Sequence, residues 1–350
     1  MDLPPDLVHA LNLLTESIPR PTLNSAAARL SSRYRHDRSD PAVPYIRSAD
    51  DAVAYAAYRM PATFAAAYAC FTQVRKERPD FQPARVLDVG AGSGAATWAA
   101  LEVWPRIDVV RLIERDAHMA RVGQSLMQST RLPAFRSAHW MHSDAVVPQV
   151  EGGNDLVLAS YIVGEVSAAD SNRFLDNMWQ ACTETMVVIE PGTPAGFRTV
   201  LAARARLLTH ESKMIAPCPH EVECPMASGD WCHFSQRLPR MEAHRAAKSG
   251  RLSYEDEKFS YIAVSRQPAA LPFARIVRHP QTRPGRIGLT LCTRDGLQQS
   301  LVTRRNKALF RLARQAHWGD SFLSDESRSK DPYSPACYIC QTAYALRRRE

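Results

Sequence analysis

The sequence predicts an α/β fold in which a mostly parallel sheet carries helices on both faces. Three observations predict it. Short β-branched runs alternate with helical segments from residue 85 to about residue 208, a glycine-rich turn follows the first of these runs, and strand-like runs recur after residue 259. The first two observations indicate a Rossmann-like domain, and the third indicates a β-rich lobe. The length of 350 residues suits one large domain or two ordinary ones.

The first segment, residues 1–78, is expected to be a helical extension. The leucines between Leu7 and Leu14 form an apolar face, and two alanine-rich stretches follow, one from Asp50 to Ala57 and one from Pro61 to about Val74. The sequence therefore predicts several helices before the sheet begins.

The second segment, residues 79–212, is expected to be the core of the parallel sheet. Its strand candidates are Arg85–Val89, Val109–Glu114, Ala138–Met141, Asp155–Ser160 and Met186–Glu190. Helical segments separate them, as around Ser171–Cys182, and this alternation is typical of strands joined by crossover helices.

The turn after the first strand reads Asp88-x-Gly90-x-Gly92-x-Gly94 and leads into a helix. Glycines let the backbone turn sharply and approach a ligand closely, and the helix presents free N–H groups. One alternative is a dinucleotide-binding site, but its fingerprint would place the third glycine one residue later. The other alternative is a tight turn that binds no ligand. The spacing instead resembles motif I of class I S-adenosylmethionine methyltransferases.

That resemblance implies a role for each polar residue near the turn. Asp88 would help to hold the methionine end of the cofactor, and Glu114 the ribose, with Asp116 as an alternative. Asp144, after the third strand, would contact adenine, and Ser160 would line the pocket after the fourth strand. The sequence shows neither the Asn/Asp-Pro-Pro-aromatic signature nor a nucleophilic cysteine there, so no catalytic residue is predicted.

Residues 213–258 form a cysteine-rich segment in which Cys218, Cys224 and Cys232 follow a C-x5-C-x7-C pattern. These gaps are wider than in common zinc knuckles, and the repeated Cys-Pro is familiar from ferredoxin-like loops. A fourth thiol, Cys292, lies further along, and four thiolates suit an iron–sulfur cluster. A zinc site with His220 or His233 as a further ligand, and ordinary free thiols, remain alternatives.

Residues 259–325 read as a β-rich basic lobe, with a hairpin signal at Asp295-Gly296. Arginines interleave with its strands and follow its hairpin, among them Arg275, Arg286 and Arg305. Such residues either form a solvated face or follow a phosphate backbone. The last segment, residues 326–350, is expected to be a flexible tail, and its Cys337 and Cys340 are expected to be plain thiols.

Taken together, the chain resembles the methyltransferase-like family of the mitochondrial small ribosomal subunit, which also has bacterial members. The segments that carry the resemblance are Tyr58–Thr63, Leu87–Gly94, Ala159–Glu165, Cys218–Phe234, Phe259–Tyr261, Leu291–Gly296 and Trp318–Asp320. The resemblance implies S-adenosylmethionine binding and a [4Fe–4S] cluster on Cys218, Cys224, Cys232 and Cys292. It also implies an enzyme that methylates small-subunit rRNA during ribosome assembly. The alternative is a non-catalytic assembly factor that binds the rRNA.

The bulk composition agrees with an RNA partner. There are 44 lysines and arginines against 36 acids, a net charge of +8, which favours a polyanion. No apolar run is long enough to span a bilayer, so no membrane partner is expected. Acids and prolines between Met1 and Asp6 are unlike a secretory signal or a transit peptide, which predicts a cytoplasmic, bacterial-type member. A monomer is expected.

Overall fold

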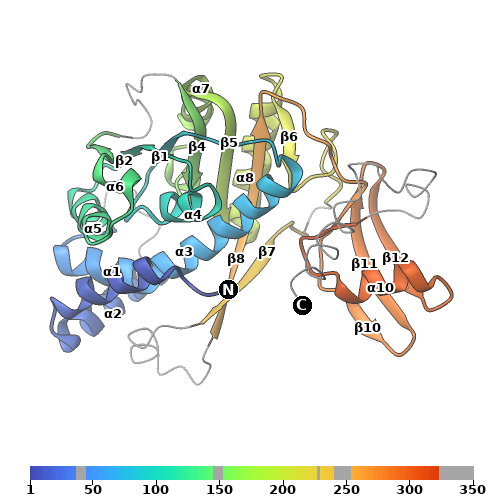
Figure 1. Ribbon diagram of the computed structural model, residues 1–350, viewed down its shortest axis with the longest axis horizontal. Helices are drawn as coiled ribbons and strands as arrows, with labels where there is room; N and C mark the ends of the chain where they lie inside the picture. Colours follow the sequence, from blue (N-terminus) through green and yellow to red (C-terminus); the bar gives the residue numbers. More distant parts are fainter. Residues whose placement is uncertain (37–44, 145–152, 227–228, 240–253, 323–350) are drawn as a thin grey trace. The chain divides into compact units, whose positions relative to one another are not determined.

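The computed structural model describes residues 1–36, 45–144, 153–226, 229–239 and 254–322 (Figure 1). The chain divides into two compact units. The first comprises residues 1–217 and 226–269, and the second comprises residues 218–225 together with the chain from residue 270 onward. The sequence-based division into five segments is a separate prediction, which this division into two units does not test.

The first unit is built on an eight-stranded sheet in the order β3-β2-β1-β4-β5-β8-β6, with β7 paired to β8. Its strands are β1 (Arg85–Val89), β2 (Val109–Ile113), β3 (His139–Met141), β4 (Asn154–Ser160), β5 (Cys182–Pro191), β6 (Lys213–Ala216), β7 (Phe234–Pro239) and β8 (Tyr254–Ser265). β1 to β5 pair in parallel, whereas β8 runs antiparallel to β5, β6 and β7. This order, with one reversed strand near the edge, confirms the class I methyltransferase fold.

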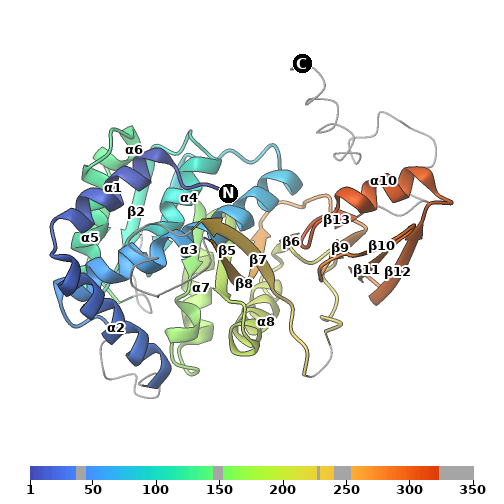
Figure 2. The same ribbon diagram turned by 90° about the horizontal axis from the view of Figure 1, so that it is seen from below.

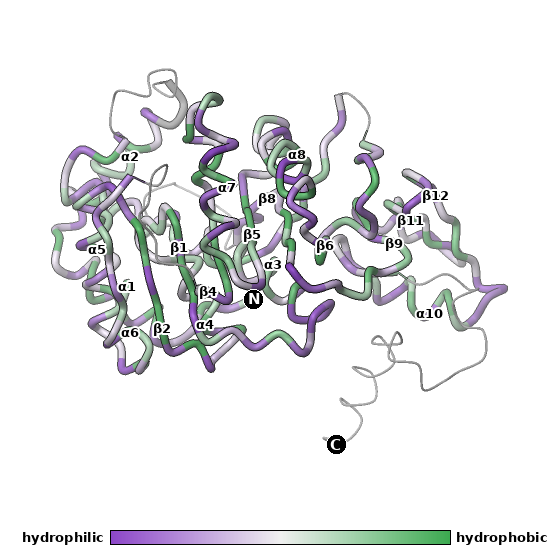
Figure 3. Tube along the Cα trace, turned by 90° about the horizontal axis from the view of Figure 1, so that it is seen from above, coloured by the Kyte–Doolittle hydropathy of each residue, from purple (hydrophilic) through white to green (hydrophobic). Residues whose placement is uncertain are grey.

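Helices cover both faces of this sheet. They are α1 (Pro5–Glu16), α2 (Arg20–His36), α3 (Ala49–Glu77), α4 (Ala95–Val103), α5 (Ala117–Gln128), the short α6 (Pro133–Arg136), the 3₁₀ turn η1 (Val163–Glu165), α7 (Ser171–Ala181) and α8 (Pro194–Leu208). Figure 2 shows α4 on one side of the sheet and α7 and α8 on the other. In Figure 3 hydrophobic segments run along the central strands, as expected for parallel strands buried on both faces.

The longest helix, α3, is continuous where the sequence suggested two stretches. Ser48 caps it by accepting a hydrogen bond from the backbone N–H of Asp51, and Pro61 lies inside it. A proline within a helix removes a hydrogen bond and normally kinks or ends the helix. Here the alanine-rich face from Ala52 to Ala67 is almost fully buried, and this packing holds the helix together.

The second unit is a five-stranded sheet with one helix. The strands are β9 (Ala274–Ile276), β10 (Gln281–Arg283), β11 (Arg286–Thr293), β12 (Gly296–Thr303) and β13 (Ser321–Phe322), and the helix is α10 (Lys307–Gln315). β11 pairs with β12 on one side and with β10 and β9 on the other, all antiparallel. Ile287, Leu289 and Leu291 point toward the same core as Ala313 of α10. One face of the sheet therefore forms the core, and the other is mostly polar, with Leu297 and Leu301 exposed on it.

In the described ranges, no helix has both the length and the apolarity needed to cross a membrane.

Candidate functional site

The glycine-rich turn lies at the carboxyl edge of the sheet, where β1 ends and α4 begins. Gly90, Gly92 and Gly94 have φ angles of +67°, +57° and +84°, a region that residues with a Cβ rarely adopt. β1 stands between β2 and β4, where the strand order reverses. Open α/β sheets bind their ligands at this switch point, so the turn marks the candidate cofactor cleft.

Asp88 is the penultimate residue of β1, just before the turn, and is 1% exposed. Its Oδ2 accepts hydrogen bonds from the backbone N–H of Thr97 at 3.2 Å and from the Thr97 hydroxyl at 2.7 Å. Its Oδ1 has no hydrogen-bond partner within the described ranges. Burial raises the pKa of Asp88 to about 6. A buried carboxylate oxygen without a hydrogen-bond donor costs folding free energy unless a ligand donates to it. The ammonium group of an amino-acid ligand would be a suitable donor.

Glu114 follows β2 and faces the turn. Its Oε2 accepts from the backbone N–H of Gly92 at 2.8 Å, and its Oε1 accepts from the backbone N–H of Asp116 at 2.8 Å. Burial raises the pKa of Glu114. Asp116 instead caps α5 by accepting from the N–H groups of His118 and Met119. Of the two acids considered from the sequence, Glu114 is therefore the one held against the glycine turn, and each of its oxygens accepts one backbone hydrogen bond.

Two further predicted residues lie at the same edge. Ser160 is the last residue of β4, and its Oγ is buried without a hydrogen-bond partner in the described chain. Asp144 lies exposed after β3, at the end of a described range. Because the carboxyl ends of parallel strands share one edge, the sheet brings Asp88, Glu114, Asp144 and Ser160 to that edge. Their roles toward a cofactor remain predictions.

A polar cluster next to this edge joins three distant parts of the first unit. The Tyr161 hydroxyl donates to Oε1 of Glu257 at 3.0 Å. Arg59 of α3 donates to both carboxylate oxygens of Glu257, at 3.0 and 3.3 Å. Tyr161 also has a φ of +60°, which is strained for a residue with a side chain. Sequence reasoning missed Glu257, and the only signal for Arg59 was its place in the Tyr58–Thr63 segment.

This cluster is poorly suited to removing a proton. Burial, helped by the negative charge of Glu257, raises the pKa of Tyr161 well above its usual range, so the phenol is neutral at pH 7. The Glu257 carboxylate is neutralised by Arg59. Glu190, buried at the end of β5, accepts from the backbone N–H of Gly164 at 3.2 Å. The cluster is therefore built to position groups rather than to act as a base.

Three of the four predicted cluster ligands belong to the second unit, namely Cys218, Cys224 and Cys292. Cys292 is 7% exposed on β11, and its Sγ lies 3.5 Å from Nε2 of the buried His220. The fourth, Cys232, belongs to the first unit, where its carbonyl oxygen accepts from the Ser260 hydroxyl at 2.7 Å.

No group of three or more His, Cys, Asp or Glu side chains is arranged to hold a metal ion within the ranges that the structure describes. The structure therefore does not show the four-thiolate site. Cys337 and Cys340 lie outside the described residues.

The predicted phosphate-contacting arginines divide into two kinds. Arg275 is 1% exposed and donates to the carbonyl oxygen of Gly319 and the hydroxyl of Ser321. Its role is to hold β9 to β13 and to the residues just before β13, which rules out for Arg275 both the solvated face and the phosphate contact that the sequence left open. Arg286 and Arg305, by contrast, are exposed.

Comparison with known protein families shows which family the chain belongs to. The family model described as "Mitochondrial small ribosomal subunit Rsm22" matches residues 49–323, which is most of the chain. The chain belongs to the Rsm22 family. This confirms the resemblance inferred from the motifs and makes the protein a methyltransferase-like member of a small-subunit family.

Curated relatives agree with this. The human protein "Ribosome assembly protein METTL17, mitochondrial" is 30% identical over 285 residues, which cover 76% of this chain and 61% of the relative. The fission yeast "Rsm22-cox11 tandem protein 2, mitochondrial" is 23% identical, over 81% of this chain and 44% of the relative. The chain thus spans roughly half of the length of these relatives.

Solved structures show weaker likeness. A putative RNA methyltransferase from Pyrococcus horikoshii overlaps with a TM-score of 0.37 at 14% identity, over 57% of this chain and 81% of its own. Magnesium protoporphyrin IX methyltransferase from Synechocystis, with bound S-adenosylmethionine, overlaps with a TM-score of 0.39 at 11% identity, over 67% and 90%. At these scores the fold assignment depends on the strand order itself.

The comparisons overturn one prediction. A cytoplasmic protein was expected, but the family and both named relatives are mitochondrial, so that expectation is wrong. It depended on the composition between Met1 and Asp6, a local feature that the match over residues 49–323 outweighs. The monomeric state and the bacterial branch stay predictions.

Proposed function

We propose that the first unit binds S-adenosylmethionine at the carboxyl edge of its sheet and that the chain methylates RNA of the small ribosomal subunit during assembly. The main support for the cofactor assignment is the buried Oδ1 of Asp88, which has no hydrogen-bond partner among the described residues and precedes three glycines with positive φ. Asp88 would accept from the amino group, Glu114 from the ribose and Asp144 from adenine, with Ser160 lining the pocket. The cofactor would supply an activated methyl group. Membership of the Rsm22 family supports the ribosomal partner.

The test is transfer of labelled methyl from S-adenosylmethionine to immature small subunits. The wild-type chain is expected to label the RNA, and Asp88→Ala is expected to lose both cofactor binding and label. Asp116→Ala is a matched control, because that acid caps α5 instead of facing the glycine turn. Equal cofactor affinity in all three proteins would contradict the assignment of the cleft.

One observation favours a second candidate, a non-catalytic assembly factor that binds rRNA and keeps the cofactor pocket for structure. Beside the cleft, Arg59 and Tyr161 already occupy the carboxylate of Glu257, so this acid is a poor base. Cofactor binding without methyl transfer to any immature subunit would select this candidate over the enzyme.

We further propose a structural [4Fe–4S] cluster on Cys218, Cys224, Cys232 and Cys292. Its support is the family resemblance and the presence of three of these thiols in one compact unit. Anaerobic purification should yield a brown protein with about four iron and four sulfide per chain. Cys292→Ser should lose both, whereas Cys70→Ala, a buried thiol of α3, should keep them. If the purified protein instead contains one zinc per chain, the proposed cluster is wrong and the cysteines form a zinc site.

A further inference from the structure

Residues 270–322, which form the strands and the helix of the second unit, carry as much net positive charge as the whole chain. Residues 270–322 contain nine arginines and one lysine but only two acids, Asp295 and Asp320, a net charge of +8. The complete chain has 44 basic and 36 acidic residues, also a net charge of +8. The remaining 297 residues therefore balance, with 34 of each sign. The excess positive charge is thus local to this lobe.

Within the lobe, two turns bring cations to one end of the sheet. The backbone N–H of Arg304 donates to the carbonyl oxygen of Gly285 at 3.2 Å, which joins the turn after β12 to the turn between β10 and β11. Arg286 stands opposite Arg283 on one side and Thr303 on the other. We call this the basic end, and its exposed members are Arg283, Arg286, Arg304, Arg305 and Lys307.

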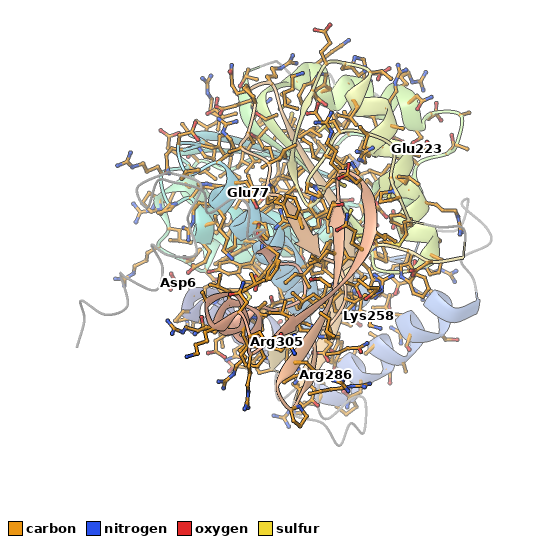
Figure 4. The ribbon with its side chains drawn as sticks, turned by 90° about the vertical axis from the view of Figure 1, so that its right-hand side faces the viewer. Asp6, Glu77, Glu223, Lys258, Arg286 and Arg305 are labelled. Atoms are coloured by element: carbon orange, nitrogen blue, oxygen red, sulfur yellow. The ribbon has the colours of Figure 1, made fainter. Side chains whose placement is uncertain are left out.

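Three acids of the second unit, Glu221, Glu223 and Asp295, lie near the other end of β11. A Cβ at Gly296, in the β11–β12 hairpin, would lie 4.0 Å from Pro225, so the segment that contains Glu221 and Glu223 packs there, next to Asp295. Six residues of strand separate Arg286 from Cys292 near that hairpin, roughly 20 Å. Figure 4 shows Arg286 and Arg305 at one end of the lobe and Glu223 well away from them.

The cations of the basic end have no carboxylate partners in the part of the chain that the structure describes. Among the described residues, no ion pair includes any of the five. Four of the five are arginines, whose planar guanidinium groups bind phosphate oxygens in pairs. A surface with this charge and this donor geometry is complementary to a phosphate backbone.

The adjoining open face of the sheet indicates which nucleic acid fits. It is the face opposite the core, and register places on it the exposed or half-buried residues Gln281, Arg283, Arg286, Gly288, Thr290, Leu297, Gln299, Leu301 and Thr303, together with the buried Cys292. None of these is aromatic. Single-stranded RNA is usually held by stacking of its bases on aromatic side chains, whereas double-stranded RNA is held through its phosphates and shape.

We propose that the basic end of the second unit binds the phosphate backbone of double-stranded RNA. This deepens the proposed function, because it requires an RNA partner, and it assigns that partner to a surface separate from the cofactor residues. Loss of counterions from the RNA makes such binding depend steeply on salt.

The test is the affinity of the full chain for a 20-base-pair RNA hairpin, measured by fluorescence anisotropy at several salt concentrations. One variant combines Arg283→Gln, Arg286→Gln, Arg304→Gln and Arg305→Gln. The matched control removes the same charge from exposed arginines of the first unit and combines Arg106→Gln, Arg121→Gln, Arg131→Gln and Arg136→Gln. The basic-end variant should bind roughly 10- to 100-fold more weakly, with a salt slope lower by about 3 to 4.

The control variant should bind within about threefold of the wild-type chain. Equal losses in the two variants would overturn the proposal, since net charge alone would then explain binding. A preference for an unstructured 20-mer over the hairpin would overturn the duplex assignment. If only binding to anionic lipid vesicles fell in the basic-end variant, the surface would be a membrane site. A wild-type chain that binds no RNA would instead refute the proposed function itself.

Discussion

Arg33 and Arg78 of the first unit and Arg286 and Arg305 of the second use their guanidinium groups in opposite ways. In the first unit Arg33 lies 2.6 Å from Asp51 and Arg78 lies 2.8 Å from Glu184, so each guanidinium ties one element to another. In the second unit Arg286 and Arg305 are exposed, and neither takes part in an ion pair with the described residues. Paired arginines contribute to the fold, whereas unpaired exposed ones are available to a partner. The same residue type therefore ties elements together at Arg33 and Arg78 and, in our proposal, binds RNA at Arg286 and Arg305.

The largest expected loss of stability comes from removing one partner of a buried arginine ion pair in the first unit. Asp51 is 1% exposed and accepts hydrogen bonds from Arg29 and Arg33, the latter only 12% exposed. Asp51→Ala leaves the guanidinium of Arg33 buried without a carboxylate, although it still donates to the carbonyl oxygen of Tyr45, and should lower the free energy of unfolding by about 3–5 kcal/mol, measured by urea denaturation. Asp50→Ala, at the neighbouring position of the same helix, should cost under about 1 kcal/mol.

Acid should reproduce this loss. Burial alone would raise the pKa of Asp51, but the hydrogen bonds from Arg33 and Arg29 outweigh it and hold the pKa below the ordinary value of 3.8. A group with a lowered folded pKa contributes stability above its unfolded pKa and loses it as the pH falls further. Equal losses for the Asp50 and Asp51 variants, at neutral pH, would contradict the structural role of the pair.

The second effect concerns Asp88, which has no arginine partner. Its pKa rises from 3.8 to about 6 on folding, so the folded chain binds more protons than the unfolded chain between these values. Unfolding free energy should therefore fall as the pH rises through that window, by about 3 kcal/mol in total. Asp88→Asn should remove this fall. An unchanged pH profile in the variant would show that Asp88 is not the group responsible.

A smaller effect is expected at Tyr161. Tyr161→Phe removes the hydrogen bond to Glu257 but leaves Arg59 in place, and should cost about 1.5 kcal/mol because the lost bond has a charged acceptor. Tyr58→Phe removes a hydrogen bond to the neutral amide oxygen of Asn24 and should cost less. Thermal unfolding of the two variants compares them, and a larger loss in Tyr58→Phe would argue against the cluster as a positioning device.

The smallest effect on stability should come from the basic end. The variant with four glutamines there should unfold within about 0.5 kcal/mol of the wild-type chain, because exposed, unpaired side chains contribute little. Calorimetry on the RNA-free protein measures this. A loss of several kcal/mol would mean that these arginines belong to the fold, which would remove the contrast between the units.

The sequence predicted the elements whose signals are local. Strands such as Val109–Ile113 and the turn Gly90–Gly94 were found because a parallel strand is a continuous apolar run and the glycines mark the turn. The elements that were missed include β6, β7, the first half of β8, and β10, α10 and β13 of the second unit. β7 and that half of β8 alternate polar and apolar residues weakly, and their pairing with each other decides their structure.

Other errors share this cause. Cys182 fitted the end of a helical pattern, yet it begins β5 because its backbone pairs with Asn154 of β4. Arg275 reads as a surface cation, but it is buried against the segment around Gly319, 44 residues away. The contact between Arg59 and Glu257 spans 198 residues. Nothing in the local sequence specifies such partners, so these features needed the structure.

The most direct test of the division between the units measures two dissociation constants on three proteins. S-adenosylmethionine affinity by calorimetry and hairpin RNA affinity by anisotropy are compared for the wild-type chain, Asp88→Ala and the four-glutamine variant of the basic end. The predicted result is that Asp88→Ala loses at least tenfold in cofactor affinity and keeps RNA binding, while the four-glutamine variant does the reverse. If either variant lost both ligands while remaining folded, the division of roles between the two units would be contradicted.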